Sequence, residues 1–147
     1  MYPHPNNLPD WLKPVLLGGA LLLAVTGALW LWLHYRLGAG SAEGALPHAW
    51  EAMLMRLHGL GVVVFLFALG GLGPVHVPRG WREQRSVRSG LTMVTCAVLL
   101  AASGYALYYW VGEAMRPLLG WLHSAVGLLM AIAFVFHWRG RSTRNAA

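Results

Sequence analysis

Four long apolar stretches, separated by short polar connections, make up most of the chain. They cover roughly Val15–Leu33, Met53–Leu72, Leu91–Val111 and Leu118–Phe136. Each is close to the ~20 residues that a helix needs to cross a hydrocarbon core about 30 Å thick. The pattern predicts an all-α membrane protein, in which residues 1–147 form a single domain, a bundle of four transmembrane helices. We expect these helices at about 15–36, 50–73, 89–111 and 118–138.

The composition agrees with this prediction. The chain is 57% hydrophobic and 11% charged, with a mean hydropathy of +0.52, whereas a soluble domain is typically about 25% charged. The connections between the apolar stretches are too short to hold a catalytic, flavin-binding or nucleotide-binding domain. We therefore expect a multi-pass membrane protein that contacts lipid and has no soluble catalytic domain of its own.

The net charge of +6 is explained by topology rather than by a nucleic-acid partner, because the basic residues gather on one side of the predicted membrane. The basic residues expected on that side are Lys13, Arg79, Arg82, Arg85, Arg88, Arg139, Arg141 and Arg144. The other side has three arginines balanced by three glutamates. Because cytoplasmic loops carry an excess of lysine and arginine, both termini are predicted to be cytoplasmic, in the inner (cytoplasmic) membrane of a bacterium.

The last apolar stretch has a histidine near each end, His123 and His137, which are separated by fourteen positions. At 100° per residue, this offset comes within about 40° of whole turns, so both rings leave one face of the helix, roughly 21 Å apart along its axis. Histidines inside a membrane span are rare, costly and usually functional. Two of them on one stripe predict two sites stacked across the bilayer, as two haems would require.

The second apolar stretch contains one histidine, and another lies shortly after its end. His58 and His76 are separated by eighteen positions, which is five whole turns of an ideal helix or about 27 Å. Pro74 removes a backbone donor, and three nearby glycines weaken the helix, so we expect a kink or unwinding there. Such a distortion would bring His76 to the depth that His137 reaches in fewer residues.

The two histidine-bearing helices resemble each other, which suggests an internal repeat of two helical hairpins. Leu-His58-Gly resembles Leu-His123-Ser, and both stretches continue to a second histidine followed closely by Arg-Gly. Both helices are expected to start at the periplasmic side. His58 and His123 therefore form one pair of similar depth, and His76 and His137 form the other. Each pair can ligate one haem iron from opposite faces, so two haem b groups are the expected cofactors.

Other assignments stay open. His34, in an aromatic belt at the end of helix one, is an alternative ligand for the periplasmic haem. Arg56, Arg79 and Arg139 lie near span ends and are candidates to bind haem propionates, although arginines snorkel at the ends of ordinary spans too.

Further candidates concern the space around the histidines and the kind of metal. Three glycines beside the periplasmic histidines are expected to leave room for a flat macrocycle: Gly59, Gly61 and Gly127. Zinc or copper would need three or four converging ligands, and the histidines of one helix are some 20 Å apart. The alternative to any iron site is that the histidines form hydrogen bonds within the bundle.

The segments Leu-His58-Gly, Pro-Val-His76-Val-Pro-Arg-Gly-Trp-Arg and Trp-Leu-His123…His137 resemble the small four-helix cytochrome b (b561-type) superfamily. This superfamily includes the membrane cytochrome b subunits of bacterial formate dehydrogenases and hydrogenases. The resemblance covers mainly residues 50–140, and the spacing of the two histidines on the last helix is its most specific part. It implies a di-haem four-helix bundle that passes electrons to or from the quinone pool. Several members use a first-helix histidine as a ligand, which is why His34 competes with His58.

We therefore expect an electron-transfer subunit of an oxidoreductase complex rather than a catalyst that acts alone. This di-haem cytochrome would relay electrons between a partner redox subunit, such as an iron–sulfur protein, and quinone. A haem-free structural or assembly subunit of a membrane complex is one alternative. A stand-alone quinone or superoxide oxidoreductase is another.

Overall fold

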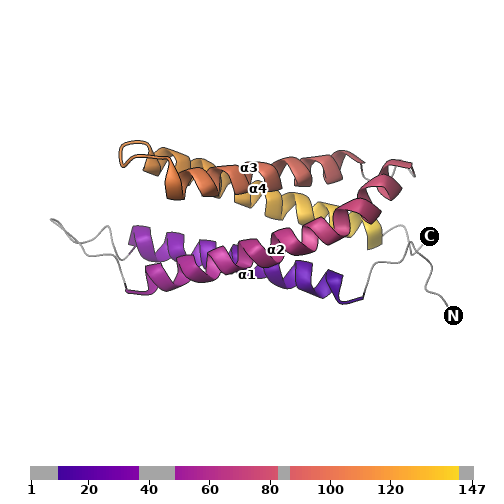
Figure 1. Ribbon diagram of the computed structural model, residues 1–147, viewed down its shortest axis with the longest axis horizontal. Coiled ribbons are helices and arrows are strands. Elements are labelled where there is room, and N and C mark those ends of the chain that lie inside the picture. The colour runs from indigo at the N-terminus through magenta and orange to yellow at the C-terminus, as the bar shows by residue number, and fades with distance from the viewer. Residues whose placement is uncertain (1–9, 37–48, 83–86, 143–147) are drawn as a thin grey trace. The chain divides into compact units, whose positions relative to one another are not determined.

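The computed structural model describes residues 10–36, 49–82 and 87–142, with the backbone alone at 75–76, 79–80 and 138–142. These residues form α-helices throughout, apart from short turns (Figure 1). The helices are α1 (Leu12–Arg36), α2 (Ala49–Arg82), α3 (Val87–Tyr109) and α4 (Arg116–Ser142). Each contains a segment long and apolar enough to cross a membrane, with mean hydropathy between 1.7 and 2.0. The predicted all-α architecture with four spanning helices is confirmed.

The first of two compact units, residues 1–76, contains α1 and most of α2 as an antiparallel hairpin (Figure 1). At one end, a Cβ built on Gly71 would lie 3.4 Å from Cδ1 of Leu12. At the other end, Nδ1 of His34 lies 3.0 Å from Oε2 of Glu51. Contacts therefore join the start of α1 to the far part of α2 and the end of α1 to the start of α2.

The two helices of this hairpin approach closely at a glycine. A Cβ added to Gly19 would lie 3.2 Å from both Cα and N of Phe65, so there is no room for a side chain between the two backbones. The adjacent Gly18 has nothing within 4 Å of such a Cβ. Small residues at helix contacts let backbones pack closely in a membrane, where dispersion rather than the hydrophobic effect holds helices together.

The second unit, residues 77–147, contains the α3–α4 hairpin, which is closed by the turn Trp110–Met115. The amides of Trp110 and Val111 both donate to the carbonyl of Ala106 at 2.9 Å and so end α3. The guanidinium of Arg116 donates to the carbonyl of Val111 at 3.4 Å, which ties the start of α4 back to the end of α3. Pro117 follows in the first turn of α4, where its missing N–H costs no hydrogen bond.

The α-helix that contains the predicted second span, at about residues 50–73, continues beyond the end of that span. α2 stays helical through Pro74 and Pro78 to Arg82, so the backbone does not unwind at the glycines before Pro74. Each proline removes only one donor from the helical ladder, and the turns on either side continue the helix. The apolar span itself is Ala49–Pro74. Hydropathy therefore located the boundary of the apolar span and not the end of the helix.

Large apolar side chains cover the outer surfaces of both hairpins. Leu21 and Val63 are each 66% exposed in the first, and Leu128 and Phe136 are 64% and 68% exposed in the second. The most buried apolar residues of the described chain are mainly small ones, with Ala68, Cys96, Ala97 and Ala133 all among them. Exposed leucine, valine and phenylalanine beside small buried residues are typical of helices that face lipid.

Candidate functional site: hydroxyl–histidine pairs in two hairpins

His58 in α2 contacts a hydroxyl group of the neighbouring helix. Its Nδ1 lies 3.0 Å from Oγ1 of Thr26, a residue of α1 that is only 3% exposed. The next residue of α1 is Gly27, where an added Cβ would lie 3.4 Å from Cε1 of the His58 ring. The ring therefore rests against the α1 backbone at the glycine while its nitrogen contacts the adjacent hydroxyl.

His123 in α4 has the same surroundings in the second hairpin. Its Nδ1 lies 2.8 Å from Oγ of Ser103 in α3. The following residue is again a glycine, Gly104, where an added Cβ would lie 3.5 Å from Cε1 of the His123 ring. A hydroxyl residue followed by glycine thus faces the first histidine in both hairpins.

The second histidine of α4 also has a hydroxyl partner. Nδ1 of His137 lies 3.0 Å from Oγ of Ser89, near the start of α3. Ser89 and Ser103 have the same separation on α3, fourteen positions, as His123 and His137 have on α4. One antiparallel register therefore serves both pairs, and they are separated by about 21 Å of helical rise.

The first hairpin has a different pair of residues at the corresponding depth. Fourteen positions before Thr26 lies Leu12, and fourteen positions after His58 lies Leu72, so this register places two leucines where the second hairpin has Ser89 and His137. Leu12 is 2% exposed and packs beside Gly71. The position is filled by apolar packing.

The other expected site residues lie as follows. His76, Arg79 and Arg139 belong to the helical parts of α2 and α4, and their side chains lie outside the described residues. The sequence predicts a kink or unwinding that would reposition His76; α2 remains helical at this position and so does not unwind there. Arg56 is exposed on α2, two residues before His58.

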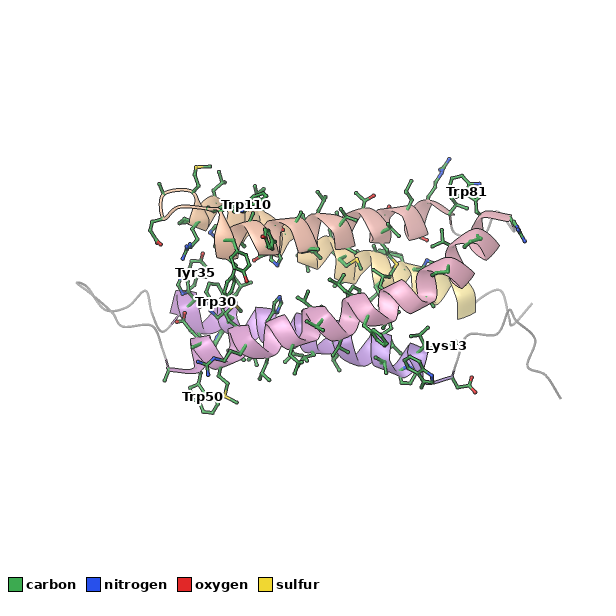
Figure 2. The ribbon with its side chains drawn as sticks, viewed as in Figure 1. Lys13, Trp30, Tyr35, Trp50, Trp81 and Trp110 are labelled. Carbon is green, nitrogen blue, oxygen red and sulfur yellow. The ribbon has the colours of Figure 1, made fainter. Side chains whose placement is uncertain are left out.

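His34 contacts an acid rather than a hydroxyl. Its Nδ1 lies 3.0 Å from Oε2 of Glu51, a residue that is only 6% exposed. The His34 ring stacks on Trp30 with a centroid distance of 4.5 Å. Trp30, Tyr35 and Trp50 lie at this end of the hairpin, whereas Lys13 lies at the other (Figure 2). His34 is thus part of an aromatic cluster where α1 ends and α2 begins.

The three glycines expected to leave space for a macrocycle have different surroundings. A Cβ on Gly59 would have nothing within 4 Å, in agreement with open space there. A Cβ on Gly61 would lie 3.2 Å from Leu23 of α1, and one on Gly127 would lie 3.9 Å from Leu100 of α3. Gly61 therefore serves the helix–helix contact.

Sequence reasoning missed Thr26 and treated Ser103 only as a small residue of a scaffold helix. A signal was present: Ala24-Val-Thr-Gly in α1 and Ala101-Ala-Ser-Gly in α3 share a hydroxyl–glycine step. The comparison of helices two and four found the histidines, whereas the matching comparison of helices one and three would have found their partners. Ser89 has no counterpart in α1 and could not be found in this way.

These contacts describe a multi-pass membrane protein with two helical hairpins. In each hairpin, a histidine within an apolar span contacts a hydroxyl group of the other helix. Among the residues whose placement is described, no three histidine, cysteine or acidic side chains gather around one point. Comparison with protein-family models, with curated proteins and with solved structures found no match for this chain.

Proposed function

We propose that the protein is a di-haem b-type cytochrome of the bacterial inner membrane, with both termini in the cytoplasm. It would carry electrons between a partner redox subunit, such as an iron–sulfur protein, and the quinone pool. The observation that carries this proposal is the hydroxyl contact at Nδ1 of His58, His123 and His137. Histidines that bind metals almost always donate the N–H of their other ring nitrogen to a nearby acceptor, and a hydroxyl oxygen can accept such a bond.

The residues fit haem b better than a classical metal site. Zinc and copper take three or four protein ligands that converge on one ion, whereas haem iron needs at most two axial imidazoles. His58, His123 and His137 each contact a hydroxyl group of the other helix of their own hairpin. An apolar surrounding of this kind would keep water from an iron atom and so influence its reduction potential.

The roles of the chain's residues follow from this assignment. His58 and His123 would ligate one haem, and His76 and His137 the other, while Arg56, Arg79 and Arg139 would pair with propionates near the membrane surfaces. Haem would supply a reversible one-electron couple between ferric and ferrous iron. The protein would bind and orient the haem and exclude water from it. Lys13, before the first apolar stretch, and the arginines after Pro78 support a cytoplasmic location for the start of α1 and the end of α2.

The first test is spectroscopic. The purified full-length chain should show a reduced-minus-oxidised b-type α-band and two haems per chain, and His123→Ala should lose one of the two while the helical content is retained. The second candidate function, a haem-free structural or assembly subunit, is favoured by the fact that the same hydrogen bonds join the helices of each hairpin. Absence of the α-band in the wild-type protein would support that candidate and exclude the cytochrome.

A turnover assay of the isolated chain distinguishes the proposed subunit role from that of a stand-alone quinone or superoxide oxidoreductase. The isolated chain, with its haem content measured, should exchange electrons with a quinone only when a redox partner supplies or removes them. Sustained quinone or superoxide turnover without any other protein would replace the proposed subunit role by the stand-alone one.

A further inference from the structure

The hydroxyl groups of Thr26 and Ser103 each form a second hydrogen bond. That second bond indicates which atom is the donor in the contact with the histidine ring. Oγ1 of Thr26 donates to the carbonyl of Leu22 at 2.6 Å. Oγ of Ser103 donates to the carbonyl of Leu99, also at 2.6 Å. Both are bonds from a side chain to the carbonyl one turn earlier, which serine and threonine commonly make inside helices.

A hydroxyl group has one proton and two acceptor lone pairs. The hydroxyl proton of Thr26 is directed to carbonyls of its own helix, at 2.6 Å from Leu22 and 3.3 Å from Leu23. Its contact with His58 then uses a lone pair, and the proton in that contact comes from the ring, which also forms a hydrogen bond with the backbone of Leu23. The same reasoning applies to Ser103 and His123. In a neutral imidazole one nitrogen is a donor and the other is an acceptor. Nδ1 is then the protonated atom of both rings, and Nε2 has the lone pair.

We propose that Thr26 and Ser103 are positioning residues that hold His58 and His123 in the Nδ1–H tautomer, so that Nε2 of each ring is the atom that binds haem iron. The inference rests on the proposed haem function and deepens it by assigning the ligating atom and its support. The adjacent glycines contribute to this support, because Gly27 and Gly104 let Cε1 of each ring lie against the neighbouring helix. In each hairpin, the first helix thereby helps to hold the proposed histidine ligand that lies on the second helix.

The two pairs occupy equivalent places in the repeat, which argues against chance. One sequence offset, 77, relates Thr26 to Ser103, and a second, 65, relates His58 to His123. The same two offsets relate other contacts of the hairpins: His34 with Glu51 corresponds to Val111 with Arg116. The identities at those ends differ between the hairpins, whereas the hydroxyl, the glycine and the histidine are retained in both.

The test removes each hydroxyl while keeping the size of the side chain nearly constant. The variants are Thr26→Val and Ser103→Ala, and the conservative variants Thr26→Ser and Ser103→Thr should restore the contact. The matched control is Ser124→Ala, since Ser124 is next to His123 but its hydroxyl donates to the carbonyl of Gly120 at 2.9 Å. All variants are studied as full-length protein in detergent micelles.

The first measurement is loss of haem from the holoprotein to an excess of a soluble haem scavenger. Loss of a supporting hydrogen bond typically weakens metal binding about 10–100-fold, so Thr26→Val and Ser103→Ala should release one of their two haems faster by about the same factor. The reduction potential of that haem should rise, because a ligand whose N–H is hydrogen-bonded is more basic and favours ferric iron. Ser124→Ala should match the wild type, and the conservative variants should recover most of the effect.

The second measurement does not depend on haem. Histidine ¹⁵N NMR of the full-length chain prepared without haem reports which ring nitrogen bears the proton. We expect Nδ1–H for His58 and His123, with that preference lost in Thr26→Val and Ser103→Ala respectively. Nε2–H in the wild type, or unchanged haem release and potential in both hydroxyl variants, would overturn the inference.

The two proposals fail in different ways. A wild-type chain without a b-type α-band contradicts the cytochrome assignment, and the NMR measurement on that same chain still decides the tautomer. A wild-type chain with two haems whose release and potential ignore Thr26 and Ser103 leaves the cytochrome standing and removes the positioning role.

Discussion

The α1–α2 and α3–α4 hairpins share a register but use it differently. In the second hairpin, one stripe of α3 supplies a hydroxyl to both histidines of α4, at Ser89 and Ser103. In the first, the stripe of α1 supplies Thr26 alone, and the place of the second pair is taken by Leu12 against α2. The second hairpin thus has two histidines that each contact a serine hydroxyl. The described part of the first hairpin has one histidine that contacts a hydroxyl.

The difference bears on how the proposed di-haem arrangement would arise from a repeated hairpin. A duplicated hairpin with one hydroxyl–histidine pair accounts for Thr26 with His58 and for Ser103 with His123. The register gives the pair Ser89 with His137 to the second copy alone, where it keeps the spacing of fourteen on both helices. On the first side, the candidate second ligand is His76, which lies four residues beyond the position of Leu72 that the register would use.

The largest predicted effect is the loss of both haems when the histidines of the second hairpin are removed. Replacing both His123 and His137 by alanine should abolish haem binding, because each proposed haem loses one of its two axial ligands. His58→Ala in the first hairpin should remove only one haem of the two. The measurement is the haem-to-protein ratio of the purified variants, with circular dichroism to verify that the helices remain. A double variant that retains a full b-type spectrum would refute the assignment of α4 as a ligand helix.

The next effect concerns the closeness of the helices. Gly19→Ala should destabilise the first hairpin by about 1–3 kcal/mol, the typical cost of adding a methyl group to a packed contact. The added Cβ would meet backbone atoms of Phe65 at 3.2 Å, and backbone cannot move aside as a flexible side chain would. The measurement is the denaturant or thermal unfolding free energy in micelles.

Two controls isolate this steric effect. Gly18→Ala makes the same chemical change where an added Cβ has nothing within 4 Å, so it measures the gain in helix propensity alone. By the repeat offset of 77, the counterpart of Gly19 in the second hairpin is Cys96, which is buried and already has a Cβ. Cys96→Ala should therefore cost less than Gly19→Ala. Equal stability of Gly18→Ala and Gly19→Ala would show that the α1–α2 contact is looser than the structure has it.

Hydropathy was sufficient to predict the fold, because span length and apolar content depend on the bilayer and hardly on packing. The first apolar stretch ends at Leu33 and the second begins at Met53, whereas α1 ends at Arg36 and α2 begins at Ala49, so the helices extend a turn past the apolar stretches. α2 also continues beyond the end of its apolar span for a physical reason: Pro74 and Pro78 each delete one hydrogen bond, and the surrounding turns are enough to continue the helix to Arg82.

The site was half predictable. The histidines stood out because they are costly in an apolar span, whereas Thr26 and Ser103 did not, because a hydroxyl that donates to its own helix carries little cost there. Which hydroxyl meets which ring depends on the rotation and register of two helices. A single-helix pattern does not contain that information, although a comparison of α1 with α3 would have supplied part of it.

The smallest predicted effect compares the closed ends of the two hairpins. His34→Ala should lower the unfolding free energy by about 1 kcal/mol, since the His34 side chain is 45% exposed and a hydrogen bond of this kind typically contributes about that much. Both haems should remain, because His34 contacts Glu51 in an aromatic cluster at the end of the hairpin. The matched control is Glu113→Ala, at the corresponding end of the second hairpin. The Glu113 side chain is 88% exposed and its carboxylate lies 3.5 Å from Arg116, so its removal should leave stability unchanged. Haem loss in His34→Ala together with haem retention in His58→Ala would transfer the ligand role from α2 to α1 and with it the partner of His123.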